Sequence, residues 1–445
     1  MHVSVLSAPA SSISRSNSSE PRVSCQGALV TGADYRGLGI VRSLGRRGIP
    51  VWVLKHGGQV LGAASRYACR GLSCPPLEDD RQSLDFLVDL AVREKITGWS
   101  LFPTTDESVT LIARHHQQLA EHYRLTTPPW DLVRWACDKR LLYQLAADLG
   151  LAYPWTFCPR DREELAALEC SFPLILKPAM RMGFNRLSRD KAWRVEDRAS
   201  LLARYDEACR LLPPEILMVQ EVLPGWGEAQ FSYAALCQNG SALASIVARR
   251  RRQFPMDFGR FSTYVETVEE PEVVQAAVRL LAAMRFTGLI EVEFKQDPRD
   301  GKFKVLDLNP RAWGWHTLCG RAGVDFPYLA WLLARGETVP EAHGRTGVRW
   351  VRMGADLAMA IQEIWRGRLS LAGYLRSLGG SLECAMFAWD DPMPGLIGLP
   401  VLTAMLAKRF LQPKLLATRH PAKDREAVRL NGDLEGVLRR TRLQP

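Results

Sequence analysis

GLIEVEFKQDPRDGKFKVLDLNPR, residues 288–311, is the stretch that decides the fold prediction. Apolar residues alternate with polar ones over 288–294 and again over 303–309, which is the period of a β-strand with one buried face. Asp300-Gly301, a dipeptide typical of a hairpin turn, stands between the two runs. These residues therefore predict an antiparallel hairpin.

Acidic and amide side chains recur at every second position of the predicted hairpin. Glu291 and Glu293 share one face of the first strand, and Asp307 and Asn309 share one face of the second. Such oxygen groups repel one another unless a cation lies between them, and oxygen ligands without thiols suit Mg²⁺ or Mn²⁺. We therefore predict a metal site at Glu293, Asp307 and Asn309. The alternative is a solvated acidic face.

The composition of the chain excludes several classes of protein. Its 445 residues suggest about three domains. A content of 47% apolar and 24% charged residues argues against a largely disordered chain, a collagen and a polytopic membrane protein. The net charge of +10 favours anionic ligands. The ten cysteines show no paired CxxC spacing, so we expect reduced thiols and a cytoplasmic protein.

The predicted organisation has four parts. Residues 1–24 are rich in Ser, Asn and Pro and are expected to form a disordered tail. Residues 25–127 read as alternating strands and helices, which predicts a Rossmann-like parallel α/β layer. Its glycines do not form the GxGxxG fingerprint, so a dinucleotide site is not expected. A second, larger α+β region follows, and residues 341–445 are predicted to form a helical extension.

Two lysines stand where a phosphate contact would be well placed. Lys177 ends an apolar strand and precedes a proline, and Lys139 stands at the start of a predicted helix. The alternative for Lys139 is an ordinary surface lysine, and for Lys177 a lysine that extends its side chain from the strand end to solvent.

A second predicted strand ends in polar groups. Gln220, Glu221 and Val222 end this strand, and its backbone groups could contact an adenine edge. Glu228 follows the next turn, and its carboxylate could accept hydrogen bonds from ribose hydroxyls. The alternative is an ordinary strand end.

The run Arg249–Arg252 is basic but lacks the interleaved aromatic residues of a single-strand nucleic-acid binder, so we expect no nucleic-acid partner. Alternation would place Arg249 and Arg251 on one side of the strand and the other two arginines on the opposite side, so that one pair faces a phosphate.

The order of these features resembles the ATP-grasp superfamily over residues 27–340, and the hairpin is its most specific part. Within the superfamily the chain looks closest to the carboxylate–amine ligase branch, which includes proteins similar to D-aspartate ligase and to carbamoyl phosphate synthase. The resemblance implies an α/β N-terminal pre-ATP-grasp domain at 25–127 and an α+β ATP-grasp fold at 128–340, in which two subdomains clasp ATP. A helical C-terminal extension would follow at 341–445.

The resemblance also implies a role for each candidate residue. Arg311 would stabilise the transferred phosphate or an acyl phosphate and, with Lys177, would be catalytic. The remaining roles are phosphate contacts at Lys139 and Lys177 with a further one at Arg249 or Arg251, the adenine hinge at Gln220, Glu221 and Val222, the ribose contact at Glu228, and magnesium ligation at Glu293, Asp307 and Asn309.

These roles predict an ATP-dependent ligase that joins a small carboxylate to an amine through an acyl phosphate. The alternative is an ATP-binding regulatory or scaffold protein, because the loop after Lys177 has one glycine where the superfamily has a glycine-rich lid. We also consider a homodimer, and weak contact of the apolar segment 394–407 with a membrane surface.

The substrate pocket leaves alternatives open. Asp106 either orients the acceptor or is an acid at a helix N-terminus. Trp313, Trp315 and His316 follow Arg311 and are candidates to line the carboxylate site. His316 is either a general base or a packed histidine.

Overall fold

A computed structural model describes residues 26–77, 80–180, 192–225, 227–254, 256, 259 and 261–398. The predicted polar tail lies outside the described residues, as do most of the loop after Lys177 and the segment 394–407 beyond residue 398.

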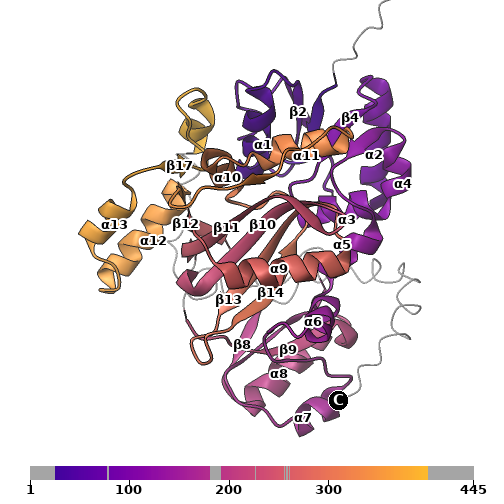
Figure 1. Cartoon of the computed structure of the whole chain (residues 1–445). Coiled ribbons are helices and arrows are strands. Elements are labelled where there is room, and N and C mark those ends of the chain that lie inside the picture. Colours follow the sequence, from indigo (N-terminus) through magenta and orange to yellow (C-terminus); the bar gives the residue numbers. More distant parts are fainter. Residues whose placement is uncertain are drawn as a thin grey trace, which may run out of the picture. The chain divides into compact units, whose positions relative to one another are not determined.

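A five-stranded parallel sheet occupies the N-terminal part, in the order β3-β2-β1-β4-β5 (Figure 1). The order reverses between β1 and β4, and the chain after each strand end enters α1 and α3. The elements are β1 (Ala28–Val30), α1 (Tyr35–Gly45), β2 (Val51–Lys55), β3 (Arg70–Ser73), α2 (Asp80–Arg93), β4 (Trp99–Phe102), α3 (Asp106–Arg114), α4 (His116–Ala120) and β5 (Tyr123–Leu125).

A four-stranded sheet follows, in the order β6-β9-β7-β8. Leu174 and Leu176 of β7 are buried with side chains of α7 and α8, which cover one face of the sheet. Lys177 therefore points from the opposite face. The elements are α5 (Trp130–Cys137), α6 (Lys139–Asp148), β6 (Thr156–Phe157), α7 (Arg162–Ala167), β7 (Leu174–Pro178), β8 (Trp193–Val195), α8 (Arg198–Cys209), the 3₁₀ turn η1 (Pro214–Ile216) and β9 (Leu217–Glu221).

An eight-stranded sheet carries the acidic hairpin, in the order β14-β13-β10-β11-β12-β16-β17, with β15 paired to β11. Helix α9 packs against β10 and β11 (Figure 1). The elements are η2 (Gly227–Ala229), β10 (Gln230–Gln238), β11 (Ser241–Phe254), β12 (Phe261–Thr267), α9 (Pro271–Met284), β13 (Gly288–Gln296), β14 (Phe303–Asn309), α10 (His316–Ala322), α11 (Phe326–Ala334), β15 (Ala342–His343), β16 (Arg349–Val351), α12 (Met353–Trp365), α13 (Leu371–Ser377) and β17 (Leu382–Cys384).

The predicted hairpin is present, and its connection contains Asp300-Gly301 as the sequence suggested. The connection runs from Asp297 to Lys302, and the N–H of Gly301 donates to the Asp297 carbonyl at 2.8 Å. Gly301 has a φ of +73°, which a glycine adopts without strain. The connection is thus closed by the Asp297 carbonyl, which lies outside the Asp300-Gly301 dipeptide.

The C-terminal part is not purely helical, which corrects the sequence prediction. β16 pairs with β12, and β17 pairs with β16, so this part of the chain extends the large sheet. Strands of three residues are too short to show an alternating pattern, and the sequence signal was dominated by α12 and α13. No helix among the described residues has the length and hydropathy to cross a membrane.

Candidate functional site

The acidic hairpin brings its predicted residues together. Glu293 and Asp307 are cross-strand partners on β13 and β14. The Asn309 amide nitrogen donates to the Glu293 carboxylate at 2.8 Å. Lys139, from the start of α6, lies 2.7 Å from the Asp307 carboxylate. The three residues predicted as metal ligands thus form one cluster, and a predicted phosphate lysine adjoins it.

A β-bulge shapes this cluster. The register shifts after the Glu293–Asp307 pair, so that Leu306 has no cross-strand partner. The Leu306 carbonyl accepts hydrogen bonds from Tyr143 Oη at 3.1 Å and Lys139 Nζ at 3.4 Å. The bulge therefore attaches α6 to the acidic hairpin. The alternation of apolar and polar residues assumes a regular strand, so the sequence did not predict this bulge.

A third carboxylate, that of Glu291, adjoins this cluster. Its carboxylate accepts from Asn309 Nδ2 and from Trp315 Nε1, each at 3.0 Å. Burial, followed by the charge of Glu293, raises the pKa of Glu291 to about 7. The Glu291 carboxyl is therefore protonated at a higher pH than an ordinary glutamate.

Replacing Glu291 with Gln should change how stability depends on pH. A carboxyl with a folded-state pKa raised from 4.5 to about 7 favours folding at low pH and loses that contribution as pH rises through this interval. In a chelating buffer, we expect the wild-type free energy of unfolding to fall by roughly 1–3 kcal/mol more than that of the variant between pH 5 and pH 8. Urea denaturation at both pH values measures this. Parallel pH profiles would contradict the assignment.

A chain of hydrogen bonds connects Lys177 to the acidic hairpin. Lys177 Nζ donates to Gln220 Oε1 at 2.6 Å, and Gln220 Nε2 donates to Tyr143 Oη at 3.0 Å. Tyr143 in turn donates to the Leu306 carbonyl, one residue before Asp307. Lys177 of the four-stranded sheet and the acidic cluster therefore belong to one connected network, in which Gln220 positions Lys177.

The arginine run contributes a different residue from the predicted pair. Arg250 Nη2 lies 3.5 Å from the Glu293 carboxylate. Arg249 instead donates to the Glu228 carbonyl at 2.7 Å, and Arg251 pairs with Glu266. Arg250, which was not among the predicted residues, thus adjoins the cluster, and the phosphate contact at Arg249 or Arg251 stays a prediction. The pairing of β11 with β12 is irregular at Arg251, so simple alternation along the strand does not show which arginine faces the acids.

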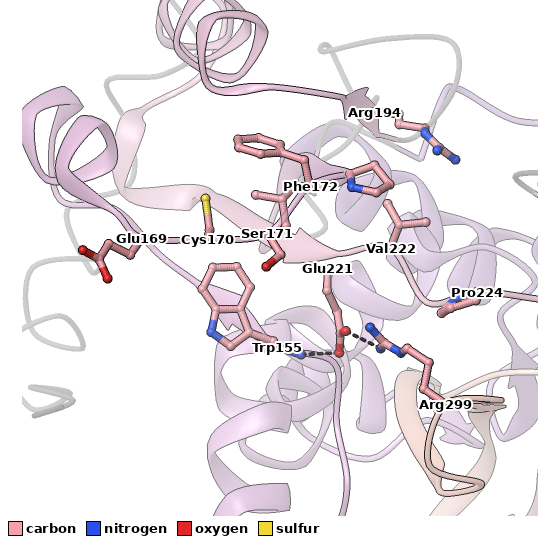
Figure 2. A pocket seen from close by; sticks show the side chains of 12 residues that line it. Trp155, Glu169, Cys170, Ser171, Phe172, Arg194, Glu221, Val222, Pro224 and Arg299 are labelled. Atoms are coloured by element: carbon pink, nitrogen blue, oxygen red, sulfur yellow. Dashed lines mark hydrogen bonds and ion pairs between the residues drawn. The ribbon is translucent and has the colours of Figure 1, made fainter.

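The predicted hinge borders a cavity of about 610 Å³, which Glu221 and Val222 line together with Trp155 and the segment 169–174. Figure 2 shows that the Glu221 carboxylate points to the Trp155 amide and to Arg299. The sequence suggested that the backbone groups at this strand end are open to a ligand. The N–H of Glu221, however, donates to the Trp155 carbonyl at 3.0 Å and is therefore already paired.

The position of Glu228 is also defined. It lies in η2, the turn that leads into β10, and its carbonyl is the group that Arg249 contacts. Its role as a ribose contact remains a prediction.

Arg311 joins the hairpin to the N-terminal part of the chain. Its Nε donates to the Asp106 carboxylate at 2.7 Å, and its Nη2 donates to Asn309 Oδ1 at 3.4 Å. Asp106 is in the first turn of α3, where a negative charge is favourable. Asp106 is thus a helix N-terminal acid that also orients Arg311.

His316 is a packed histidine. It is 2% exposed, its Nδ1 donates to the Trp313 carbonyl at 2.8 Å, and an added Cβ on Gly39 would lie 2.4 Å from its Nε2. Burial lowers the pKa of His316. This burial favours the packed histidine over the general base. Trp313 is also buried, at 1% exposure, so it does not offer a surface to a substrate.

The donor set of the cluster fits a hard divalent cation. Among the described residues no three His, Cys, Asp or Glu side chains form a metal-binding group. The cluster instead offers two carboxylates, Glu293 and Asp307, and one amide, Asn309. In this structure Lys139 and Arg250 compensate the charge of these carboxylates. Oxygen ligands few enough to leave positions for water and phosphate oxygens are typical of Mg²⁺ sites.

Comparisons with known proteins agree with this geometry. Residues 214–353 match the family model described as ATP-grasp in the biosynthetic pathway with Ter operon. D-aspartate ligase of Enterococcus faecium (strain Aus0004) is 23% identical over 261 residues, covering 53% of this chain and 59% of that protein. The N-terminal section of the Aquifex aeolicus (strain VF5) carbamoyl phosphate synthase large chain is 26% identical over 223 residues, covering 48% and 39%.

The fold is also found in solved structures. N5-carboxyaminoimidazole synthetase from Staphylococcus aureus, complexed with ADP, superposes with a TM-score of 0.57 at 14% identity, covering 77% of this chain and 86% of that one. Identity at this level establishes similarity of fold only. The chain spans 59% and 39% of the lengths of the two curated relatives.

Proposed function

We propose that this chain is an ATP-grasp protein and an ATP-dependent ligase that joins a carboxylate to an amine, because residues 214–353 match an ATP-grasp family model and the chain is similar to D-aspartate ligase and to the carbamoyl phosphate synthase large chain. ATP and Mg²⁺ are its cosubstrate and metal in this proposal, and the products are ADP, phosphate and a C–N bond. The observation that carries it is the connected site in which Lys177, Lys139 and the acidic hairpin meet.

The proposed reaction begins with attack of the substrate carboxylate on the γ-phosphate of ATP, which gives an acyl phosphate and ADP. The amine then attacks the acyl carbon, and phosphate leaves. Magnesium held by Glu293, Asp307 and Asn309 would neutralise phosphate charge. Lys177 and Arg311 act as fixed cations, placed by Gln220 and Asp106 before the substrate arrives.

Arg311 is the residue we assign to the acyl phosphate. It bridges Asn309 of the hairpin and Asp106 of α3, so it stands between the metal cluster and the N-terminal sheet. Strand ends at a point where the strand order reverses are where open α/β sheets bind ligands, and α3 follows such a strand. The carboxylate substrate is therefore proposed to lie beside Arg311 and α3.

Cytoplasmic location is part of the same proposal. Within the part of the chain that the structure describes, the cysteines form no disulfide bond, as in a reducing compartment.

The regulatory or scaffold alternative predicts nucleotide binding without turnover. We expect instead that the purified protein, with ATP, Mg²⁺ and a panel of amino acids and other small carboxylates and amines, releases ADP only with the correct pair. Arg311→Lys should lower this rate by about 10²-fold, because an ammonium cannot replace the bidentate guanidinium. Coupled measurement of ADP tests both points. ATP binding without ADP release across the panel would support the alternative.

A further inference from the structure

Three basic residues of the acidic hairpin contact the predicted hinge, Gln220 to Val222, and the residues that follow it. Lys304 Nζ lies 2.9 Å from the Glu221 carboxylate, and Arg299 Nη2 contacts its other oxygen. Lys295 Nζ donates to the carbonyls of Leu223 and Gly225, each at 2.8 Å. The hairpin thus holds the hinge through the Glu221 carboxylate, and it holds the chain just after the hinge through two backbone carbonyls.

Asp297 holds two of these basic residues, Arg299 and Lys304, in position beside Glu221. Its carboxylate accepts from Arg299 Nε at 2.9 Å and lies 2.8 Å from Lys304 Nζ, and it is fully buried. Its hydrogen bond with the Arg299 side chain, the largest cause, lowers the pKa of Asp297. A buried acid that is already ionised and paired holds both cations in the geometry that Glu221 requires. We call Asp297, Lys295, Arg299 and Lys304 the hairpin clasp.

The clasp is on the same hairpin as the acidic cluster, with Asp297 and Arg299 in the connection between the two strands. Lys295 follows Glu293 by two residues on β13, and Lys304 precedes Asp307 by three on β14. The clasp contacts the hinge at the end of β9, which belongs to the four-stranded sheet, whereas the hairpin belongs to the eight-stranded sheet. One hairpin therefore contacts the adenine end of the proposed nucleotide site through its clasp and the phosphate end through its acids.

We infer that the hairpin clasp is a positioning device that makes the protein select adenine, by holding the hinge at a set distance from the metal cluster. The inference rests on the proposed ATP site, but not on turnover. Edge recognition of a base depends on backbone groups placed to within a fraction of an ångström, whereas phosphate contacts through lysines and a metal tolerate more movement. Loosening the clasp should therefore weaken ATP binding more than GTP binding.

The strongest link is the pair between Lys304 and Glu221, whose side chains are 12% and 15% exposed. Arg299 is half exposed, so solvent screens its contribution. Glu221→Gln preserves size and one acceptor while removing the charge, and Lys304→Gln removes the same interaction from the other sheet. Both variants should act on nucleotide selection in the same way.

The experiment measures the dissociation constants of Mg·ATP and Mg·GTP by calorimetry. We expect the ratio of GTP to ATP dissociation constants to fall at least fivefold in each variant, with GTP affinity within about twofold of wild type. The double variant Glu221→Gln/Lys304→Gln should change the ratio by less than the product of the two single effects, since both substitutions break the Lys304–Glu221 pair. Arg162→Gln, which removes an exposed pair with Asp206 between α7 and α8, should leave both affinities unchanged.

An unchanged ratio in both single variants overturns the inference, and so does an equal loss of affinity for both nucleotides. If one variant fails to fold, the other decides. Wild-type protein that binds neither nucleotide would overturn the proposed function and the inference together. Wild-type protein that binds ATP selectively, with selectivity unaffected by either variant, would overturn the inference alone.

Discussion

Glu293→Gln is expected to lower the rate of ADP formation by about 10²–10³-fold, the usual cost of removing one preorganised electrostatic group from an active site. Glu293 is the cross-strand partner of Asp307 and accepts the amide of Asn309, so it is central to the proposed magnesium site. Replacing its carboxylate with an amide removes one of the two anionic ligands while retaining shape. ADP release with the substrates identified by the screen measures the effect.

Asp300→Asn is the matched control for this variant. Asp300 lies on the same hairpin, in the exposed connection, where it accepts the N–H of Lys302 at 3.0 Å. We expect its activity to stay within about twofold of wild type, since surface substitutions away from special features have small effects. Both variants should unfold at the wild-type temperature to within a few degrees. Near-wild-type turnover of Glu293→Gln would remove the metal assignment.

Asp391→Ala is expected to destabilise the protein by about 3–5 kcal/mol, because it leaves the buried Arg42 guanidinium without its counter-charge. The Asp391 carboxylate accepts from Arg42 Nε at 2.9 Å, from Ser65 Oγ at 2.7 Å and from the N–H of Arg66 at 3.0 Å. Asp391 and Arg42 are 1% and 4% exposed. This pair fastens the segment after β17 to α1, more than 340 residues earlier in the chain.

The neighbouring acid supplies a control of the same chemistry. Asp390 pairs with Arg46 at 2.7 Å, but these side chains are 43% and 42% exposed. Asp390→Ala should therefore cost under about 1 kcal/mol, as exposed ion pairs do. Urea denaturation of both variants tests the contrast. Equal destabilisation by the two variants would show that burial of the Arg42–Asp391 pair is not what stabilises this contact.

Local patterns predicted the hairpin, the parallel N-terminal layer and the membership of the acidic cluster. Alternation along a strand depends only on the backbone, so the shared face of Glu291 and Glu293 followed from the sequence. The hydrogen bond that closes the connection did not follow, because its acceptor, the Asp297 carbonyl, lies outside the turn dipeptide. The strands β16 and β17 are too short to give a periodic signal and exist because β12 offers an edge to pair with.

The sequence by itself determined which chemical groups the site holds: paired oxygen ligands, strand-end lysines and an arginine after the hairpin. Tertiary structure alone decided which of them meet. It selected Arg250 over its neighbours, buried His316 against α1, joined Arg311 to Asp106 and closed the clasp on the hinge. The physical reason is range, since periodicity is a property of consecutive residues, whereas register, bulges and ion pairs between sheets depend on segments that only folding brings together.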